Sequence, residues 1–309
     1  MFQGMHYVYE VYKEMSFSKA ARNLFISQPS LSAAVKKAEA QIGFPIFDRS
    51  SNHIQLTELG KEYIRSIEII MDVENGFQNY INDMKELKSG TIAIGGTNLF
   101  ASYVLPPLLS RFTEQYPQVQ VDLVEATTSQ LTDRLFSGSL DLLIDNKSMD
   151  PAIYQKSFFC EEHLLLAVPI RLSVNEKMKN YALTASDIRE NRHLNSRIPP
   201  VPLENFQNES FLLLKSGNDT RSRADRICHN AHIIPKVKLE LDQQITAYNL
   251  SRYGMGISFC SDTLVRHVPD DEGLVYYKLN HQDALREVNF YYKRNRYMSR
   301  IVATFLDMI

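Results

Sequence analysis

The side chains best suited to molecular recognition are uncharged hydrogen-bonding groups gathered in a short N-terminal segment. Gln28, Ser30 and Ser32 follow Ser27, whose side-chain oxygen can cap the free N–H groups of a new helix. Pro29 falls in the first turn of that helix, where its missing N–H costs nothing. Amide and hydroxyl groups at the start of a helix can hydrogen-bond base edges in the major groove. The segment therefore predicts a helix that reads DNA.

Two short helices joined by a tight turn must position these groups. One apolar stripe at helical spacing runs along the second helix: Leu31, Val35, Ala38 and Ile42. Before the turn, Ala20, Ala21 and Leu24 lie at helical spacing, and the two alanines allow another helix to approach closely. The opposite face of the second helix carries Gln28, Ser30, Ser32, Ala33, Lys36 and Lys37. This pattern predicts a helix-turn-helix, whose second helix enters the major groove.

A small wing is expected after the second helix. Ile54 and Leu56 alternate with polar residues, as in a short two-stranded ribbon. Near its tip, Arg49, Asn52 and His53 could meet phosphate or the minor groove. For His53, a solvated loop position is an equally good interpretation.

From about Phe17 to Gly60 the chain resembles, in register, the DNA-binding domain of LysR-type transcriptional regulators. The resemblance rests on Ser27-Gln28-Pro29-Ser30-Leu31-Ser32, Glu39, Ile42-Gly43, Pro45-Ile46-Phe47, Arg49 and Leu56-Thr57-Glu58-Leu59-Gly60. It implies DNA contacts from Ser18, Ser27, Gln28, Pro29, Ser30, Ser32, Ala33, Lys36, Lys37, Arg49 and Asn52. Ala33 stands where the family usually has a longer polar or basic side chain, and Asn52 where an arginine is common.

Composition by itself indicates an ordinary globular protein. The 309 residues are 44% hydrophobic and 23% charged, enough for two domains and a substantial core. The formal net charge is −2, so there is no global basic signature for nucleic acid. Residues 19–49 hold five Lys and Arg against Glu39 and Asp48, an excess of three. Such an excess is usually a solvated face, and only the surrounding motif favours phosphate contacts.

The sequence also predicts where the protein is located in the cell and whether its cysteines are reduced. Glu10, Lys13 and Glu14 leave no apolar core for a signal peptide, and residues 164–170 are too short to span a bilayer. We therefore expect a cytoplasmic protein with no membrane association. Three cysteines are widely separated, odd in number and without metal-ligand spacing: Cys160, Cys228 and Cys260. We expect reduced thiols, no metal and no cofactor.

A long helix joins the two halves of the chain. Thr57 caps it, and Glu58 lies favourably in its first turn. Its apolar residues alternate by three and four, interrupted only where Glu74 falls on the seam: Tyr63, Ile67, Ile70, Phe77, Ile81 and Met84. Lys88-Ser89-Gly90 is a typical helix end. This apolar seam could pack on its own domain. A helix-turn-helix that reads two DNA half-sites needs two copies of the chain, so we favour a homodimer through residues 61–88.

From Thr91 onward, strands alternate with helices, which predicts a parallel α/β sheet. Strands are expected at 91–95, 119–125 and 140–144, and helices at 129–137 and 102–116, the latter with Pro106 and Pro107 near its first turn. This half resembles the effector-binding domain of the same family, which is two-lobed like periplasmic binding proteins. The matching segments are Gly90-Thr91-Ile92-Ala93-Ile94-Gly95, residues 138–144, residues 161–169 and Gly254-Met255-Gly256-Ile257-Ser258.

The expected fold class is an N-terminal winged helix-turn-helix, all-α with a small wing, then a long linker helix and an α/β two-lobed periplasmic-binding-protein-like sensor domain. These parts are expected at 1–60, 61–89 and 90–309. The first lobe should cover about 91–160 and 270–309, and the second about 165–265, with two crossings between them. The resemblance implies a homotetramer, built from dimers through the long helix and a second contact between sensor domains.

Polar groups recur where the expected strands end, and they predict an effector site. In open α/β sheets, ligands bind at the carboxyl ends of strands near helix N-termini. The candidates are Thr97, Asn98, Thr127, Thr128, Ser129, Ser216 and Asn218. Each hydroxyl alone is more often a helix cap, but their recurrence at three strand ends favours a small anion such as a carboxylate. Lys147, Arg221 and Arg223 could add charge, although a surface salt bridge is the commoner role of an arginine.

Other functions each leave part of the chain unexplained. The sequence has no Gly-x-Ser-x-Gly elbow, no phosphate-binding glycine loop and no His/Cys/Asp cluster at metal spacing, so we expect no enzyme. A transport receptor would need export, and a nucleoid architectural protein would be more basic and would need no sensor. We expect a regulator that binds double-stranded promoter DNA and responds to a small-molecule effector, which closes the two lobes.

Overall fold

The structure, a computed structural model, describes residues 2–49, 54–84, 90–269 and 272–309. Its N-terminal part has three helices and a wing: α1 Met5–Glu14, α2 Phe17–Asn23, α3 Gln28–Ile42, β1 Phe47–Asp48 and β2 Gln55–Leu56. Ser27 caps α3 by accepting a hydrogen bond from the N–H of Ser30 at 3.2 Å. Leu31 and Val35 of α3 are fully buried beside Ala20 and Ala21 of α2. The predicted helix-turn-helix is confirmed.

The long helix α4, Glu58–Met84, begins as the sequence predicts. The N–H of Gly60 donates to Thr57 Oγ1 at 2.9 Å. A Cβ atom at Gly60 would lie 2.1 Å from the carbonyl oxygen of Ile46, so only glycine allows α4 to lie this close to the wing. The helix end expected at Lys88 and Ser89 lies outside the described residues, and Gly90 already begins the next strand.

The expectation that the whole apolar seam of α4 faces a partner helix is wrong for its first half. Tyr63 and Ile67 are buried, 6% and 0% exposed, within the core of the helix-turn-helix domain, and Ile70 packs against the same cluster. The reason is that the domain core needs α4 to close it. Farther along, Val73 and Phe77 are 68% and 63% exposed.

The sensor half is built on nine strands in the order β4-β3-β5-β11-β6-β9-β7-β8, with β10 paired to β6. Their bounds are β3 Gly90–Gly96, β4 Val119–Glu125, β5 Leu142–Asp145, β6 Tyr154–Pro169, β7 Ser210–Leu214, β8 Lys236–Leu241, β9 Ile257–Ser261, β10 Leu274–Lys278 and β11 Leu285–Lys293. The sheet is mixed rather than purely parallel. Strands β3, β4 and β5 are parallel, as are β7, β8 and β9, whereas β6, β10 and β11 pair antiparallel.

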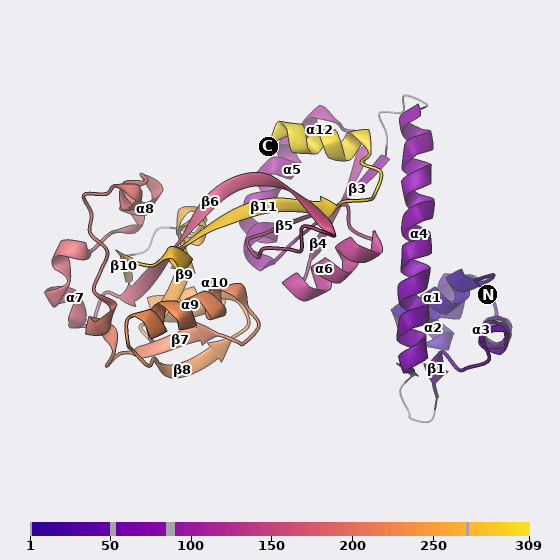
Figure 1. Ribbon diagram of the computed structural model, residues 1–309, viewed down its shortest axis with the longest axis horizontal. Coiled ribbons are helices and arrows are strands. Elements are labelled where there is room, and N and C mark those ends of the chain that lie inside the picture. The colour runs from indigo at the N-terminus through magenta and orange to yellow at the C-terminus, as the bar shows by residue number, and fades with distance from the viewer. Residues whose placement is uncertain (1, 50–53, 85–89, 270–271) are drawn as a thin grey trace.

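Helices cover both faces of the sheet in each lobe (Figure 1). The helices are α5 Leu105–Gln115, α6 Thr128–Ser137, α7 Val174–Lys177, α8 Ala185–Arg189, α9 Asp219–Asn230, α10 Gln244–Arg252, α11 Asp262–His267 and α12 Arg300–Met308. The short segments are η1 Phe100–Val104, η2 Lys179–Tyr181, η3 Arg192–Leu194, η4 Leu203–Phe206 and η5 Gln282–Ala284. Among the described residues, no helix combines the length and apolar character that a membrane crossing needs.

The helix expected at 102–116 starts earlier than predicted. The π-helical segment η1 precedes α5, and Pro106 and Pro107 lie in the first turn of α5, as predicted. Neither proline has an N–H to donate to the preceding turn. The π-helical segment η1, with its wider hydrogen-bonding pattern, ends just before these two prolines.

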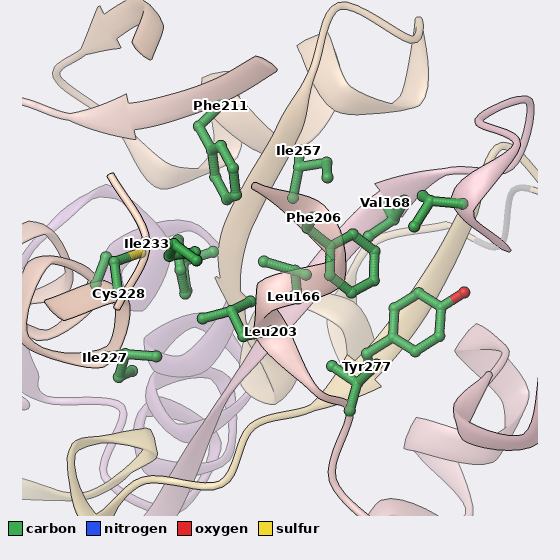
Figure 2. Close-up of a cluster of buried hydrophobic side chains, with 14 of the residues drawn as sticks. Leu166, Val168, Leu203, Phe206, Phe211, Ile227, Cys228, Ile233, Ile257 and Tyr277 are labelled. Carbon is green, nitrogen blue, oxygen red and sulfur yellow. The ribbon is translucent and has the colours of Figure 1, made fainter. Parts of the chain in front are cut away.

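One strand, β6, carries the chain from the first lobe into the second (Figure 1). Its first part, from Tyr154 to His163, pairs with β11, and its last part pairs with β9 and β10. The boundary expected at residue 270 is therefore wrong, because β10 belongs to the second lobe. Figure 2 shows the cause: Tyr277 of β10 packs beside Phe206 and Val168 in the core of that lobe. The chain returns to the first lobe only at β11.

Candidate functional site

The first half of α3 presents an uncovered polar surface. Gln28, Pro29, Ser30, Ala33, Lys36 and Lys37 are exposed on it, and Ser32 is half-buried. Ser18 on α2 donates to Gln28 Oε1 at 3.3 Å, which brings both polar groups to the same edge of the domain. Lys19 and Arg22 of α2 are also exposed. In the sequence, these two residues stand out only as part of the local excess of positive charge. Asn52 and His53 lie outside the described residues.

Glu39 attaches the wing to α3, a role that the sequence did not reveal. Its Oε1 atom accepts hydrogen bonds from the backbone N–H groups of Ile46 at 3.0 Å and Phe47 at 3.3 Å. Its Oε2 atom lies 3.1 Å from Nη2 of Arg49, whose guanidinium also covers the ring of Phe17 at 4.8 Å. Arg49, predicted as a DNA contact, is thus also part of the joint that orients the wing.

A cleft of about 100 Å³ lies between the two lobes of the sensor half. The first lobe contributes Thr97, Asn98, Leu99, Phe100, Ala126, Thr127, Thr128, Asp145 and Asn146. The second contributes Leu214, Asn218, Asp219, Thr220, Asp242, Gln243, Gln244 and Ile245, and Arg286 lies at the crossing. Of the predicted site residues, Ser129 and Ser216 are exposed and do not line it. Ser129 is rotated away from Thr128 around α6, and Ser216 lies in the turn that leads into α9.

Helix N-termini converge on this cleft from both lobes. Thr127 caps α6 with its side chain, and Asn218 caps α9 by accepting from the N–H of Thr220 at 2.9 Å. Gln243 precedes α10 without a side-chain capping bond. Each N-terminus carries free N–H groups and a partial positive charge, so together they favour the negative end of a ligand.

Several predicted ligand contacts already hold other groups of the protein. The hydroxyl of Thr128 donates to Asp145 Oδ2 at 2.8 Å, and the amide of Asn98 donates to Glu125 at 2.8 Å. Burial raises the pKa of Asp145, and the N–H of Lys147 and the hydroxyl of Thr128 only partly offset it. Asp145 is the last residue of the buried strand β5, so the strand-end argument that identified Thr97 could have identified it too.

Arg286 supplies the positive charge that lines the cleft, and it is 4% exposed. Its Nε donates to Glu162 at 2.6 Å, and its Nη1 donates to Asp219 at 2.9 Å and to Thr220 at 3.1 Å. Burial opposes its charge, but Glu162 and Asp219 outweigh burial and raise the pKa of Arg286. Asn146 donates to the same Glu162 oxygen at 3.1 Å. Nothing local in the sequence marks Arg286, because its partners come from distant segments.

The cations that the sequence offered for the cleft are engaged elsewhere. Arg221 pairs with Asp225 and Glu240, and Arg223 pairs with Asp219 at 2.8 Å. Neither they nor Lys147 line the cleft, so the commoner role of a salt-bridged arginine is the one observed. The described lining contains no histidine, cysteine or lysine side chain.

Family models match both halves of the chain. Residues 2–61 match the family described as "Bacterial regulatory helix-turn-helix protein, lysR family". Residues 85–309 match the family described as "LysR substrate binding domain".

Individual proteins agree with this assignment. The uncharacterized HTH-type transcriptional regulator YcgK of Bacillus subtilis is 29% identical over 98% of this chain and 92% of its own length. A probable RuBisCO transcriptional regulator of Synechocystis is 26% identical over 95% of this chain and 81% of its own length. A full-length OxyR variant from Pseudomonas aeruginosa has a TM-score of 0.72 at 21% identity, covering 100% of this chain and 94% of that one. CbnR bound to its target DNA has a TM-score of 0.65 at 16% identity, covering 100% and 98%.

Proposed function

The chain belongs to the LysR family of DNA-binding transcriptional regulators, and from this premise we propose how its own residues divide the work. The exposed face of α3 reads promoter DNA, with the wing held beside it by Glu39. A small molecule binds in the cleft and changes the relative position of the lobes. A second copy of the chain pairs through α4. The observation that carries the proposal is the convergence of helix N-termini from both lobes on one cleft.

Pairing through α4 is supported by an exposed apolar stripe. Ile69, Val73 and Phe77 follow one another at four-residue spacing and are 40%, 68% and 63% exposed. Apolar residues repeated at this spacing on one helix favour packing against a second helix. A further contact between sensor domains would build the homotetramer. The edge strand β8 supports it, because Val237 and Leu239 are exposed there.

The contact between α4 and the first lobe offers a route from cleft to DNA reader. Asp72 of α4 is 5% exposed and lies 2.8 Å from Lys293 and 2.7 Å from Arg296. Asp83 accepts hydrogen bonds from the hydroxyl of Tyr297 and the N–H of Arg300, both at 2.9 Å. These ion pairs and hydrogen bonds join the long helix to the end of β11 and to the segment that follows it. A shift of the lobes would therefore be transmitted to α4.

The charges in the cleft support a ligand with both signs. The N-termini of α6, α9 and α10 favour a carboxylate. Asp242 also lines the cleft, and its ion pair with Lys215 is 2.8 Å long but exposed at both ends, so that pair is weak. An ammonium group on the ligand can replace it. We therefore propose a small zwitterion such as an α-amino acid, which refines the simple anion expected from the sequence.

DNA reading by α3 is tested by replacing one polar and one charged residue. Gln28→Ala should weaken binding to the specific operator by about 1–3 kcal/mol and leave non-specific DNA unaffected, because a base contact is lost. Lys36→Ala should weaken both and reduce the salt slope by about one, because a phosphate contact is lost. Electrophoretic shifts across a salt series measure both effects, on an operator recovered by selection from random duplexes. Lys179→Ala, exposed on the second lobe, is the control. Unchanged operator affinity in both α3 variants would contradict the assignment.

The two halves of the α4 seam should respond differently to mutation. Val73→Lys with Phe77→Lys should give a monomer by light scattering with little loss of folding free energy, because both side chains are exposed. Ile67→Ala should lower the free energy of unfolding of the DNA-binding domain by about 2–5 kcal/mol, because it leaves a cavity in a fully buried site. A double lysine variant that stays dimeric would show that the dimer forms elsewhere.

The ligand class is tested by thermal denaturation of the full chain with α-amino acids, monocarboxylates and dicarboxylates. A binding amino acid should raise the midpoint more than its analogue without the amine. In Asp242→Asn that difference should shrink, because the partner of the ammonium is gone. Asp225→Asn, exposed on α9 and paired with Arg221, is the matched control. If dicarboxylates stabilise the protein and amino acids do not, the zwitterion proposal fails and the cleft binds anions alone.

A further inference from the structure

Three potential metal ligands meet in the second lobe, outside the lining of the cleft. His163 lies on β6, His193 in η3, and Asp262 begins α11. One ligand atom from each lies within 4.8 Å of the others. The three residues are far apart in the sequence, so their spacing gives no metal motif. Only the packing of the loop around η3 against α11 and β6 brings them together.

The separations suit a tetrahedral metal. Nε2 of His193 lies 3.0 Å from Asp262 Oδ2, and Nδ1 of His163 lies 3.7 Å from the same oxygen. Around zinc with bonds of about 2.0–2.1 Å, neighbouring ligand atoms are about 3.3 Å apart. The two observed distances lie on either side of this value. Small side-chain adjustments would therefore bring the three ligand atoms around one ion.

Two of the three side chains in the cluster are buried, and the third is partly exposed. The side chains of His193 and Asp262 are 1% and 3% exposed, whereas that of His163 is 30% exposed. The backbone N–H of His163 donates to Asp262 Oδ1 at 2.9 Å, which holds the carboxylate in place. Nδ1 of His193 has no hydrogen-bond partner among the described residues, so no second bond locks the ring. An ion can enter past His163 and meet two preplaced ligands.

A guanidinium also contacts the carboxylate of Asp262. Arg266, one turn later on α11, lies 3.2 Å from Asp262 Oδ2 and is itself 30% exposed. Because this side chain is partly exposed, its guanidinium can turn out to solvent. A metal ion bound to Oδ2 of Asp262 would therefore have to displace Arg266.

We propose that His163, His193 and Asp262 bind a zinc ion, with water in the fourth position. Two imidazoles and one carboxylate are ligands that zinc accepts. His163 follows Glu162 on β6, and successive side chains of a strand point to opposite faces. Glu162 holds Arg286 in the cleft on the other face. Zinc bound to His163 would thus fix the crossing strand behind the cleft and couple metal binding to ligand binding.

Calorimetric titration of the chelator-treated full chain with zinc tests the site. His163→Gln should weaken one zinc-binding event by more than the roughly 10–100-fold that loss of an outer-shell partner costs. Arg266→Gln should tighten the same event, because it removes the competing cation while leaving every ligand. His229→Gln, exposed on α9, is the matched control and should titrate like the unchanged protein. Circular dichroism confirms that the variants fold, which His163→Gln should, since its side chain is partly exposed.

The two outcomes separate a metal site from a purely structural cluster. If the histidines only brace Asp262, both variants lower the thermal midpoint and neither changes the zinc titration. Identical titrations of the unchanged protein and His163→Gln would overturn the proposal. So would an Arg266→Gln variant whose zinc affinity does not rise. Cobalt substitution gives an independent readout, because a tetrahedral site produces a visible absorption spectrum that His163→Gln should abolish.

Discussion

Where the chain passes between its lobes, a guanidinium and a carboxylate are buried together, and the position of both lobes depends on this pair. Arg286 opens β11, Glu162 lies on β6, and both side chains are at most 2% exposed. Burying two charges costs several kcal/mol each unless further hydrogen bonds satisfy them. Asp219 and Thr220 from the second lobe and Asn146 from the first supply those bonds. The pair therefore joins the crossing strands to the N-terminus of α9 and sets the back wall of the cleft.

This constraint connects the cleft to the DNA reader. Helix N-termini from both lobes surround the cleft, and Arg286 also lines it. Beyond β11, Lys293 and Arg296 reach Asp72 of α4, and α4 in turn closes the core of the helix-turn-helix domain through Ile67. We propose that a change at the crossing strands reaches α3 through these packed contacts. The same α4 leaves an apolar stripe exposed, which we propose a second copy covers.

Local features of the sequence predicted local structure well. Ser27, Pro29 and the stripe through Leu31 identified α3, and the strand at 119–125 was found as expected, because each depends on neighbours in sequence. Pairings between distant segments were missed. Tyr277 placed β10 in the second lobe, contrary to the boundary expected at residue 270. Arg286 and the His163 cluster could not be found, because their partners meet only when the sheet forms.

The central claim is that the relative position of the lobes controls how the protein reads DNA. Cross-linking Asn98→Cys in one lobe to Asp242→Cys in the other with a bifunctional thiol reagent tests it without knowledge of the ligand. Burial raises the pKa of the native thiols Cys160 and Cys228 to about 12, and burial also raises that of Cys260, so these react slowly. The account predicts that the linked protein has an operator affinity or footprint different from both single-cysteine variants treated in the same way. Identical affinity and footprint in all three proteins would contradict it.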